Sequence, residues 1–201
     1  SLTPVTSLSE TLLTLPSAQQ DEELRQGLET IYTTGKGLVN FVMSYRRLTR
    51  LPSPELTLFD VRPFLERMVQ LAQHQHPSPN VRITLERVDE DLMAFADESM
   101  MTQVVINLLK NAVQAIGGTK EGEIRIRAYV DSQDIVRMEV SNNGPKIAPE
   151  VAEQMFVPFF TTKEEGSGIG LSLSKQMMRL QGGNVSLLPY RDEWTTFVVT
   201  I

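Results

Sequence analysis

The segment Gly166-Ser-Gly-Ile-Gly-Leu171 decides the fold, because three glycines at alternate positions stand directly before a helical pattern. Alone, this pattern is weak evidence, since glycine pairs occur in many turns. Three other segments precede it, namely Gln103-Val-Val-Ile-Asn-Leu-Leu-Lys-Asn-Ala112, Val140-Ser-Asn-Asn-Gly-Pro145 and Met155-Phe-Val-Pro-Phe-Phe-Thr-Thr-Lys163. The four segments together, in this order and at these spacings, are strong evidence for one particular fold.

The four segments resemble, in chain order, the N, G1, F and G2 boxes of sensor histidine kinases, within the wider family of gyrase, Hsp90, kinase and MutL ATPases. The resemblance covers about the last three quarters of the chain firmly and the first quarter more loosely. It implies an α+β fold, in which a two-layer α/β sandwich of the Bergerat ATP-binding type follows an α-helical hairpin of a dimeric four-helix bundle. It also implies ATP and Mg²⁺ as ligands and ATP-dependent protein-histidine kinase activity.

The composition of the 201 residues bounds the possible functions. A hydrophobic content of 41% supports a globular core of one or two domains. The chain has no cysteine, which excludes a disulfide framework or a thiolate zinc site. A net charge of −6 argues against nonspecific nucleic-acid binding. No apolar run approaches the roughly 20 residues that span a bilayer, so we expect a soluble, cytoplasmic chain that meets a membrane only through other parts of its parent.

Residues 1–52 are expected to form a helical hairpin of a dimerisation and histidine-phosphotransfer domain. Apolar residues at alternating steps of four and three indicate a heptad seam over residues 21–50, and a shorter seam covers residues 1–15. Pro16 separates the two helices. Neither helix buries its stripe alone, which favours a homodimeric four-helix bundle over a hairpin packed on the second domain. The seam residues are Val5, Leu8, Leu12, Leu15, Leu24, Leu28, Ile31, Gly35, Leu38, Val42 and Tyr45.

Residues 56–201 are expected to be the catalytic ATP-binding domain, because Pro52 and Pro54 end the long helix and mark a linker. Beyond the linker, helical and extended patterns alternate, and most of the strands are expected to be antiparallel. This mixture indicates a two-layer sandwich. The predicted helices are residues 59–73, 97–116 and 172–181, and the predicted strands are residues 81–88, 123–129, 135–141, 185–190 and 195–201.

Asn107 and Asn111 lie four residues apart, so both amides leave one face of one helix. Two solvent-facing asparagines would be the ordinary explanation if this segment stood alone. Amide oxygens also suit a hard cation that keeps water and phosphate oxygens as ligands, and the resemblance implies that Asn111 binds Mg²⁺ with Asn107 assisting. Family members that hydrolyse ATP carry a glutamate at the position of Asn107. Asparagine cannot accept a proton from water, which indicates a kinase rather than a gyrase-like hydrolase.

The segment around Asn142 departs from the family pattern Asp-x-Gly-x-Gly, in which the aspartate accepts a hydrogen bond from the adenine amino group. Asn142 takes the place of the aspartate and Lys146 replaces the second glycine, while Gly144 is kept for close backbone approach. The carbonyl oxygen of Asn142 still accepts the bond, but a neutral bond is about half as strong as a charge-assisted one. We therefore expect weaker nucleotide binding without loss of specificity.

Residues 146–170 resemble the lid that covers ATP in the family, and they are called the lid below. The resemblance places Lys163 near the terminal phosphate, where an ammonium group neutralises charge during phosphoryl transfer. A solvated surface lysine is the alternative. The N–H groups of the lid glycines and the amino end of the following helix favour an anion. Further expected nucleotide contacts are Thr162, Gly166, Gly168, Gly170, Leu171 and Thr195.

Ser1-Leu-Thr-Pro4 resembles the tail of the motif that carries the phosphoacceptor histidine in one group of histidine kinases. We therefore expect that histidine to precede residue 1, so that this chain binds ATP but does not phosphorylate itself. In the parent, the γ-phosphoryl group would pass to that histidine and then to an aspartate of a response-regulator receiver domain. His74 and His76 follow the second helix, and they are expected to be solvated loop residues rather than a metal-binding pair.

Two other functions stay open at the level of the sequence. A non-enzymatic dimerisation module with a degenerate nucleotide site is suggested by Asn142, Lys146 and Trp194, the last of which replaces a glycine in a Gly-Thr-x-Phe box. A gyrase- or Hsp90-like ATPase is disfavoured by the missing glutamate at position 107 and by the N-terminal hairpin. Retention of both N-box asparagines, Lys163 and the lid glycines favours the kinase.

Overall fold

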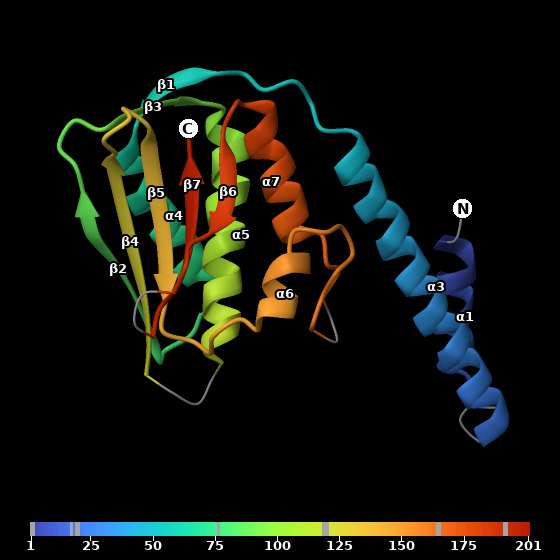
Figure 1. The fold of residues 1–201 in the computed structure, drawn as a ribbon. Coiled ribbons are helices and arrows are strands. Elements are labelled where there is room, and N and C mark those ends of the chain that lie inside the picture. The colour runs from blue at the N-terminus through green and yellow to red at the C-terminus, as the bar shows by residue number, and fades with distance from the viewer. Residues whose placement is uncertain are drawn as a thin grey trace. The chain divides into compact units, whose positions relative to one another are not determined.

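Figure 1 shows the computed structural model, which describes residues 3–16, 18, 21–75, 77–117, 121–163, 166–190 and 193–201. The chain divides into two compact units, Ser1–Arg50 and Leu51–Ile201. The first unit contains the helices α1 (Thr3–Leu13) and α3 (Glu22–Thr49), and the second combines helices with a sheet. Within the described residues, no helix is both long enough and apolar enough to cross a membrane.

Helices α1 and α3 pack side by side in opposite directions. Thr6 of α1 lies against Gly35 of α3, where an added Cβ would be 2.7 Å from the Thr6 methyl carbon. One turn further along α1, the carboxylate of Glu10 accepts a hydrogen bond of 3.4 Å from the hydroxyl of Tyr32, about one turn earlier in α3. The glycine therefore sets how closely the two helices approach.

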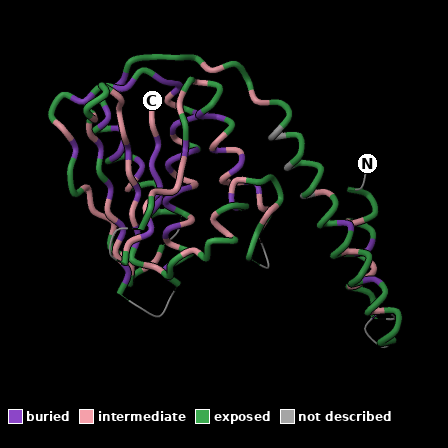
Figure 2. The backbone as a smooth tube through the Cα atoms, viewed as in Figure 1, coloured by how far each residue is buried: buried purple, intermediate pink, exposed green. Residues whose placement is uncertain are grey.

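The predicted heptad seam is buried only in part. Leu28 is 9% exposed and Gly35 is also buried, so both lie within the helix pair. Most of the other seam residues are between 43% and 61% exposed (Figure 2). These side chains form an exposed apolar stripe on the helix pair. Its exposed members are Val5, Leu8, Leu15, Leu24, Ile31, Leu38, Val42 and Tyr45.

The second unit is built on a five-stranded sheet with the strand order β2-β4-β5-β7-β6. The pair β2–β4 is parallel and the other neighbours are antiparallel. Two further strands, β1 and β3, form a separate antiparallel pair. The strands are β1 (Thr57–Asp60), β2 (Val81–Val88), β3 (Met93–Ala96), β4 (Gly122–Val130), β5 (Val136–Asn142), β6 (Asn184–Leu187) and β7 (Thr195–Thr200).

Helices α4 (Val61–Gln75), α5 (Glu98–Ile116) and α7 (Gly170–Leu180) pack on the sheet around one apolar core (Figure 1). The buried side of α5 is apolar. Asp97 caps the start of α5, where its carboxylate accepts a hydrogen bond of 2.9 Å from the backbone N–H of Met100. The predicted two-layer α/β sandwich is therefore confirmed. The buried residues of α5 include Val104, Val105, Leu108, Leu109 and Ala112.

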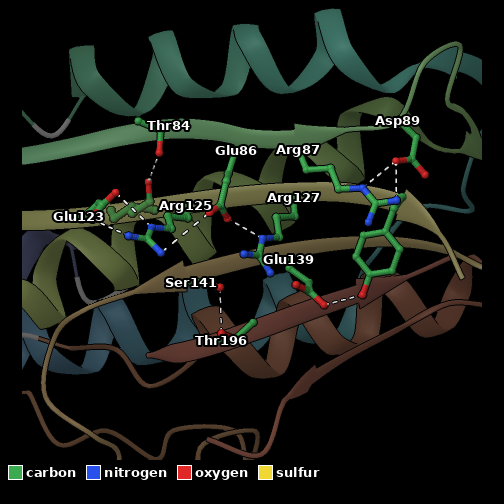
Figure 3. A network of polar contacts seen from close by, with 12 residues as sticks. Thr84, Glu86, Arg87, Asp89, Glu123, Arg125, Arg127, Glu139, Ser141 and Thr196 are labelled. Carbon is green, nitrogen blue, oxygen red and sulfur yellow. Dashed lines mark hydrogen bonds and ion pairs between the residues drawn. The ribbon is translucent and has the colours of Figure 1, made fainter. Parts of the chain in front are cut away.

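The other face of the sheet carries a network of charged side chains (Figure 3). Strand β4 alternates, so that Ile124 and Ile126 enter the core while Arg125 and Arg127 lie on the outer face. Nε of Arg127 lies 2.5 Å from Oε2 of Glu86 on the neighbouring strand. Exposed ion pairs contribute only about 0–1 kcal/mol each. The network thus keeps this face solvated and adds little to the stability of the fold.

Several elements differ from the sequence predictions. The helix expected from residue 59 begins at Val61, because Phe59 pairs with Ala94 in the unpredicted ribbon of β1 and β3. Four-residue strands give too short an alternation to be recognised. Helix α7 begins at Gly170, two residues earlier than expected, and a short helix α6 (Pro149–Gln154) within the lid was not predicted.

Candidate functional site

A cavity of about 690 Å³ in the second unit is bounded by α5, α7, the carboxyl end of β5, the start of β7 and the lid. The structure places all but one of the predicted site residues in its lining. Gly144 is the exception, and a Cβ at this position would be 2.8 Å from Nδ2 of Asn142. The predicted residues in the lining are Asn107, Asn111, Asn142, Thr162, Lys163, Gly166, Gly168, Gly170, Leu171 and Thr195.

The amide of Asn107 is held between α5 and α7. Its Nδ2 donates a hydrogen bond of 3.0 Å to Oγ of Ser174. Its Oδ1 points at the first residue of α7, because a Cβ at Gly170 would lie 2.4 Å from that oxygen. Gly170 is therefore required for close packing of the two helices at this point, in addition to any contact with a ligand.

Asn111 faces the lid. The ammonium group of Lys163 donates to Oδ1 of Asn111 at 3.4 Å and to Oε1 of Gln114 at 2.5 Å. Burial lowers the pKa of Lys163, and the neighbouring charge of Lys110 lowers it further. Two amide oxygens of one helix face thus gather around a cation, which is the arrangement that a metal ion would also use.

Gln114 is a site residue that the sequence analysis missed. It lies seven residues after Asn107 and three after Asn111, so the three amides share one helix face. Lys110, the residue before Asn111, also lines the cavity. The i, i+4, i+7 spacing was the signal that could have identified Gln114.

The floor of the cavity holds two buried polar side chains, Asn142 and Thr195. Each is 2% exposed, and they are partners in the register of β5 and β7. Among the described residues, Nδ2 of Asn142 and Oγ1 of Thr195 have no hydrogen-bond partner. Buried polar groups are rarely left without partners in folded proteins. The two side chains therefore offer unpaired polar atoms to the cavity.

The lid folds back on itself beside the cavity. The backbone N–H of Phe159 donates a hydrogen bond of 2.8 Å to the carbonyl of Gly168. Gly168 has a φ of 66°, and a Cβ there would lie 2.4 Å from the carbonyl carbon of Phe159. Phe156 packs edge-on against Phe197 with 6.5 Å between ring centroids. Phe156 thus anchors the lid on the core.

Two departures from the family pattern lie away from the cavity lining. Lys146 pairs with Glu193 at 3.0 Å. The ring of Trp194 lies under the guanidinium of Arg125, at 4.0 Å from its centroid. Of the three replacements that suggested a degenerate site, only Asn142 therefore contacts the cavity.

His74 does not line this cavity. His74 lies in the last turn of α4 rather than in a loop, and its side chain is exposed. His76 lies outside the described residues, as do Ser1 and Leu2 of the acceptor-like segment. No group of three or more histidine, cysteine, aspartate or glutamate side chains within the described ranges is placed to hold a metal ion.

Comparison with known proteins agrees with this geometry. A model of the family described as "Histidine kinase-, DNA gyrase B-, and HSP90-like ATPase" matches residues 96–201. The C4-dicarboxylate transport sensor protein DctB of Rhizobium meliloti is 37% identical over 119 residues, which cover 59% of this chain and 19% of DctB. The sensor histidine kinase ZraS of Escherichia coli K12 is 30% identical over 144 residues, which cover 72% of this chain and 30% of ZraS. The chain thus spans less than a third of the length of either relative.

The comparison with solved structures also finds histidine kinases. The catalytic domain of histidine kinase ThkA is 33% identical, with a TM-score of 0.64, and the match covers 73% of this chain and 95% of that domain. ThkA in complex with the response regulator protein TrrA is 27% identical, with a TM-score of 0.69, and the match covers 100% of this chain and 56% of ThkA. The chain belongs to the family of histidine kinase-, DNA gyrase B- and HSP90-like ATPases, and within that family to the sensor histidine kinases.

Proposed function

We propose that the cavity binds Mg·ATP and that residues 1–52 and 56–201 are, respectively, the dimerisation hairpin and the catalytic domain of a sensor histidine kinase. In a longer protein, the γ-phosphoryl group would pass to a histidine and then to an aspartate of a response regulator. The observation that carries this proposal is the pair of amide oxygens, from Asn111 and Gln114, that surround the Lys163 ammonium at the opening of a glycine-rich lid.

The two ends of the cavity suit the two ends of a nucleotide. The floor offers the buried polar atoms of Asn142 and Thr195, beside apolar side chains such as Met155 and Phe197, which suits a flat heteroaromatic base. The opposite end offers the lid glycines and the amino end of α7, where backbone N–H groups favour phosphate. Lys163 and its neighbour Lys110 add positive charge there.

The side chains present also fit a magnesium ion. Oδ1 of Asn111 already accepts from a cationic group, and Asn107 lies one turn away on the same face. Neutral amide oxygens hold Mg²⁺ only when water or phosphate oxygens complete its coordination, so metal and nucleotide are expected to bind together. When bound, Mg²⁺ would neutralise charge on the phosphates.

Asn107 favours a kinase over a hydrolase. Its amide donates to Ser174 and has no group that could take a proton from an attacking water. The residue can therefore help to position ATP while leaving the γ-phosphate for transfer to another protein group. The alternative of a gyrase-like ATPase would need a carboxylate at this position.

The exposed stripe of the helix pair supports a homodimer. Ile31 and Leu38 are 49% and 46% exposed, although both belong to the heptad seam. A second copy of the pair would cover this stripe in a four-helix bundle. The likeness to ThkA in its complex with TrrA supports a response regulator as a further partner of this chain.

Calorimetric titration of Mg·ADP into the chain tests nucleotide binding. Saturable binding is expected with Mg²⁺, at least tenfold weaker binding with excess EDTA, and a similar loss in Asn111→Ala. The control is Gln103→Ala, which removes an exposed amide from the same helix outside the cavity lining. Absence of binding would contradict the proposal. So would an affinity for ADP that changes neither with EDTA nor in Asn111→Ala.

A further inference from the structure

The buried pair at the cavity floor constrains which base the cavity takes. The side chain of Asn142 makes no hydrogen bond to a described residue, although it is 2% exposed. A Cβ at Gly144 would lie only 2.8 Å from Nδ2, so the glycine leaves the space that the amide uses. No hydrogen bond within the described part of the chain therefore holds this amide in one orientation.

A free amide and a carboxylate differ in what they offer to a purine. A carboxylate only accepts hydrogen bonds, whereas an amide carries one acceptor and one donor side by side. Half a turn about the Cβ–Cγ bond of Asn142 exchanges the two atoms, and the change in shape is negligible. The hydroxyl of Thr195 likewise donates or accepts after a simple rotation.

The edge of a purine around C6 is complementary to an amide in both common forms. Adenine presents a donor on its 6-amino group and an acceptor at N1, which match Oδ1 and Nδ2. A 6-oxo purine presents an acceptor at O6 and a donor at N1, which match the same two atoms after the half turn. A carboxylate would pair with the 6-amino group but would repel the carbonyl oxygen of the 6-oxo purine.

We infer that the base end of the cavity accepts 6-oxo purine nucleotides as well as adenine nucleotides, and that Asn142 is the residue that sets this breadth. The inference rests on the proposed binding of nucleotides, and it revises the expectation that specificity is kept. An acceptor-only side chain at this position would be selective because a polar site rejects a ligand that leaves its groups unpaired or repelled.

The test is calorimetric titration of Mg·ADP and Mg·IDP, which differ only in the base, into the whole chain. In the wild type, the two dissociation constants should agree within about tenfold, since each base forms a comparable pair with the amide. In Asn142→Asp, ADP should bind more tightly and IDP more weakly, so that their ratio changes by at least about tenfold.

The matched control is Asn143→Asp, which introduces the same charge one residue away. Asn143 is exposed, and its Oδ1 accepts a hydrogen bond of 2.9 Å from the backbone N–H of Glu123, outside the cavity lining. This variant should leave the ratio of the dissociation constants for ADP and IDP unchanged. Wild-type binding of ADP without IDP overturns the inference and leaves the proposed function standing. Failure to bind either nucleotide overturns both. An unchanged ratio of the two dissociation constants in Asn142→Asp overturns the role of Asn142, and the wild-type result decides the breadth of the cavity even if that variant does not fold.

Discussion

Nζ of Lys163 lies 2.5 Å from Oε1 of Gln114, so this side chain joins the lid to the face of α5 that carries the amides of Asn107, Asn111 and Gln114. The same ammonium group also reaches Oδ1 of Asn111, at 3.4 Å. A metal ion at Asn111 would meet this positive charge at short range and would repel it. Nucleotide binding is therefore expected to move Lys163 from the amides toward the phosphates.

The first prediction concerns Lys163→Ala. Loss of an ammonium group near the terminal phosphate should weaken binding of Mg·AMP-PNP by about 1.5–3 kcal/mol and leave Mg·ADP nearly unchanged, because only the former has a γ-phosphate. Calorimetric titration measures both affinities. Lys175→Ala is the control, since Nζ of Lys175 lies 4.4 Å from the centroid of the Phe156 ring and outside the cavity lining. Equal losses for ADP and AMP-PNP would count against a role at the γ-phosphate.

The contact between Gly170 and Asn107 predicts that the effect of Gly170→Ala on stability changes sign when the side chain of Asn107 is removed. Gly170→Ala should destabilise the chain, because the new Cβ would lie 2.4 Å from Oδ1 of Asn107. In an Asn107→Ala background the obstructing atom is gone, and the same change should stabilise α7 by about 0.5–1 kcal/mol. Urea unfolding followed by Trp194 fluorescence provides the double-mutant cycle. Additive effects would show that the two residues do not meet.

The hydrogen-bonded carboxyl of Asp97 leads us to expect that the free energy of unfolding depends on pH. Burial raises the pKa of Asp97, but hydrogen bonds from the backbone N–H groups of Glu55, Met100 and Ser99 lower it more, and the net shift is downward. A carboxyl whose pKa is lowered by folding contributes stability above its unfolded value of about 3.9, and loses it as pH falls through its folded value.

Asp97→Ala should accordingly cost about 1–2 kcal/mol of unfolding free energy at pH 7. The difference from the wild type should shrink below about pH 4, where Asp97 of the unfolded chain begins to bind its proton, until the pH has passed the lower pKa of the folded state. Urea unfolding at a series of pH values measures both effects. Glu90→Ala, which removes an exposed carboxylate, is the control. A difference that stays constant down to pH 2 would argue against an ionised cap.

Substitutions at two glycines of α3 form a matched test of how α1 packs against α3. At Gly37 a Cβ would have no neighbour within 4 Å, so Gly37→Ala should stabilise the helix by about 1 kcal/mol. At Gly35 a Cβ would lie 2.7 Å from the Thr6 methyl, and the Thr6 hydroxyl is held by a 3.0 Å hydrogen bond to the carbonyl of Thr3. Gly35→Ala should therefore speed amide exchange in α1, whereas Gly37→Ala should not. Hydrogen exchange with peptide resolution reports this directly.

The exposed stripe predicts the effect of a charge on self-association. Ile31→Glu places a carboxylate in the seam and should shift a dimer toward monomer by at least tenfold in dissociation constant, because the charge would lose its hydration in a bundle. Thr33→Glu adds the same charge to an exposed position on the far side of α3. Sedimentation equilibrium distinguishes the two variants. A monomeric wild type at high concentration would overturn the proposed dimer.

The sequence predicted those parts of the fold in which a periodic pattern is long. The i, i+4 spacing of Asn107 and Asn111 correctly placed both on one face of a helix whose other face is buried. Gln114 was overlooked because glutamine is common on exposed helix faces, and only the position of the lid lysine distinguishes it.

Loops were the harder part, because a sequence pattern does not show to which side a loop turns. Lys146 and Trp194 replace glycines within the family boxes, and these replacements were interpreted as signs of a degenerate nucleotide site. In the structure they pair with Glu193 and Arg125 instead. Asn142 and Thr195 occupy neighbouring strand ends, where the register of the sheet determines their position.

Asp97 also has a mechanical consequence. Its carboxylate accepts a hydrogen bond of 2.8 Å from the backbone N–H of Glu55, and its own N–H donates to Oε1 of Gln181 at 2.6 Å. The first residues after the helical unit are thus tied to the start of α5, and the end of α7 is tied to the same point. A displacement of residues 51–55 would therefore act on the first turn of α5, the helix of 19 residues that also carries Asn107 and Asn111.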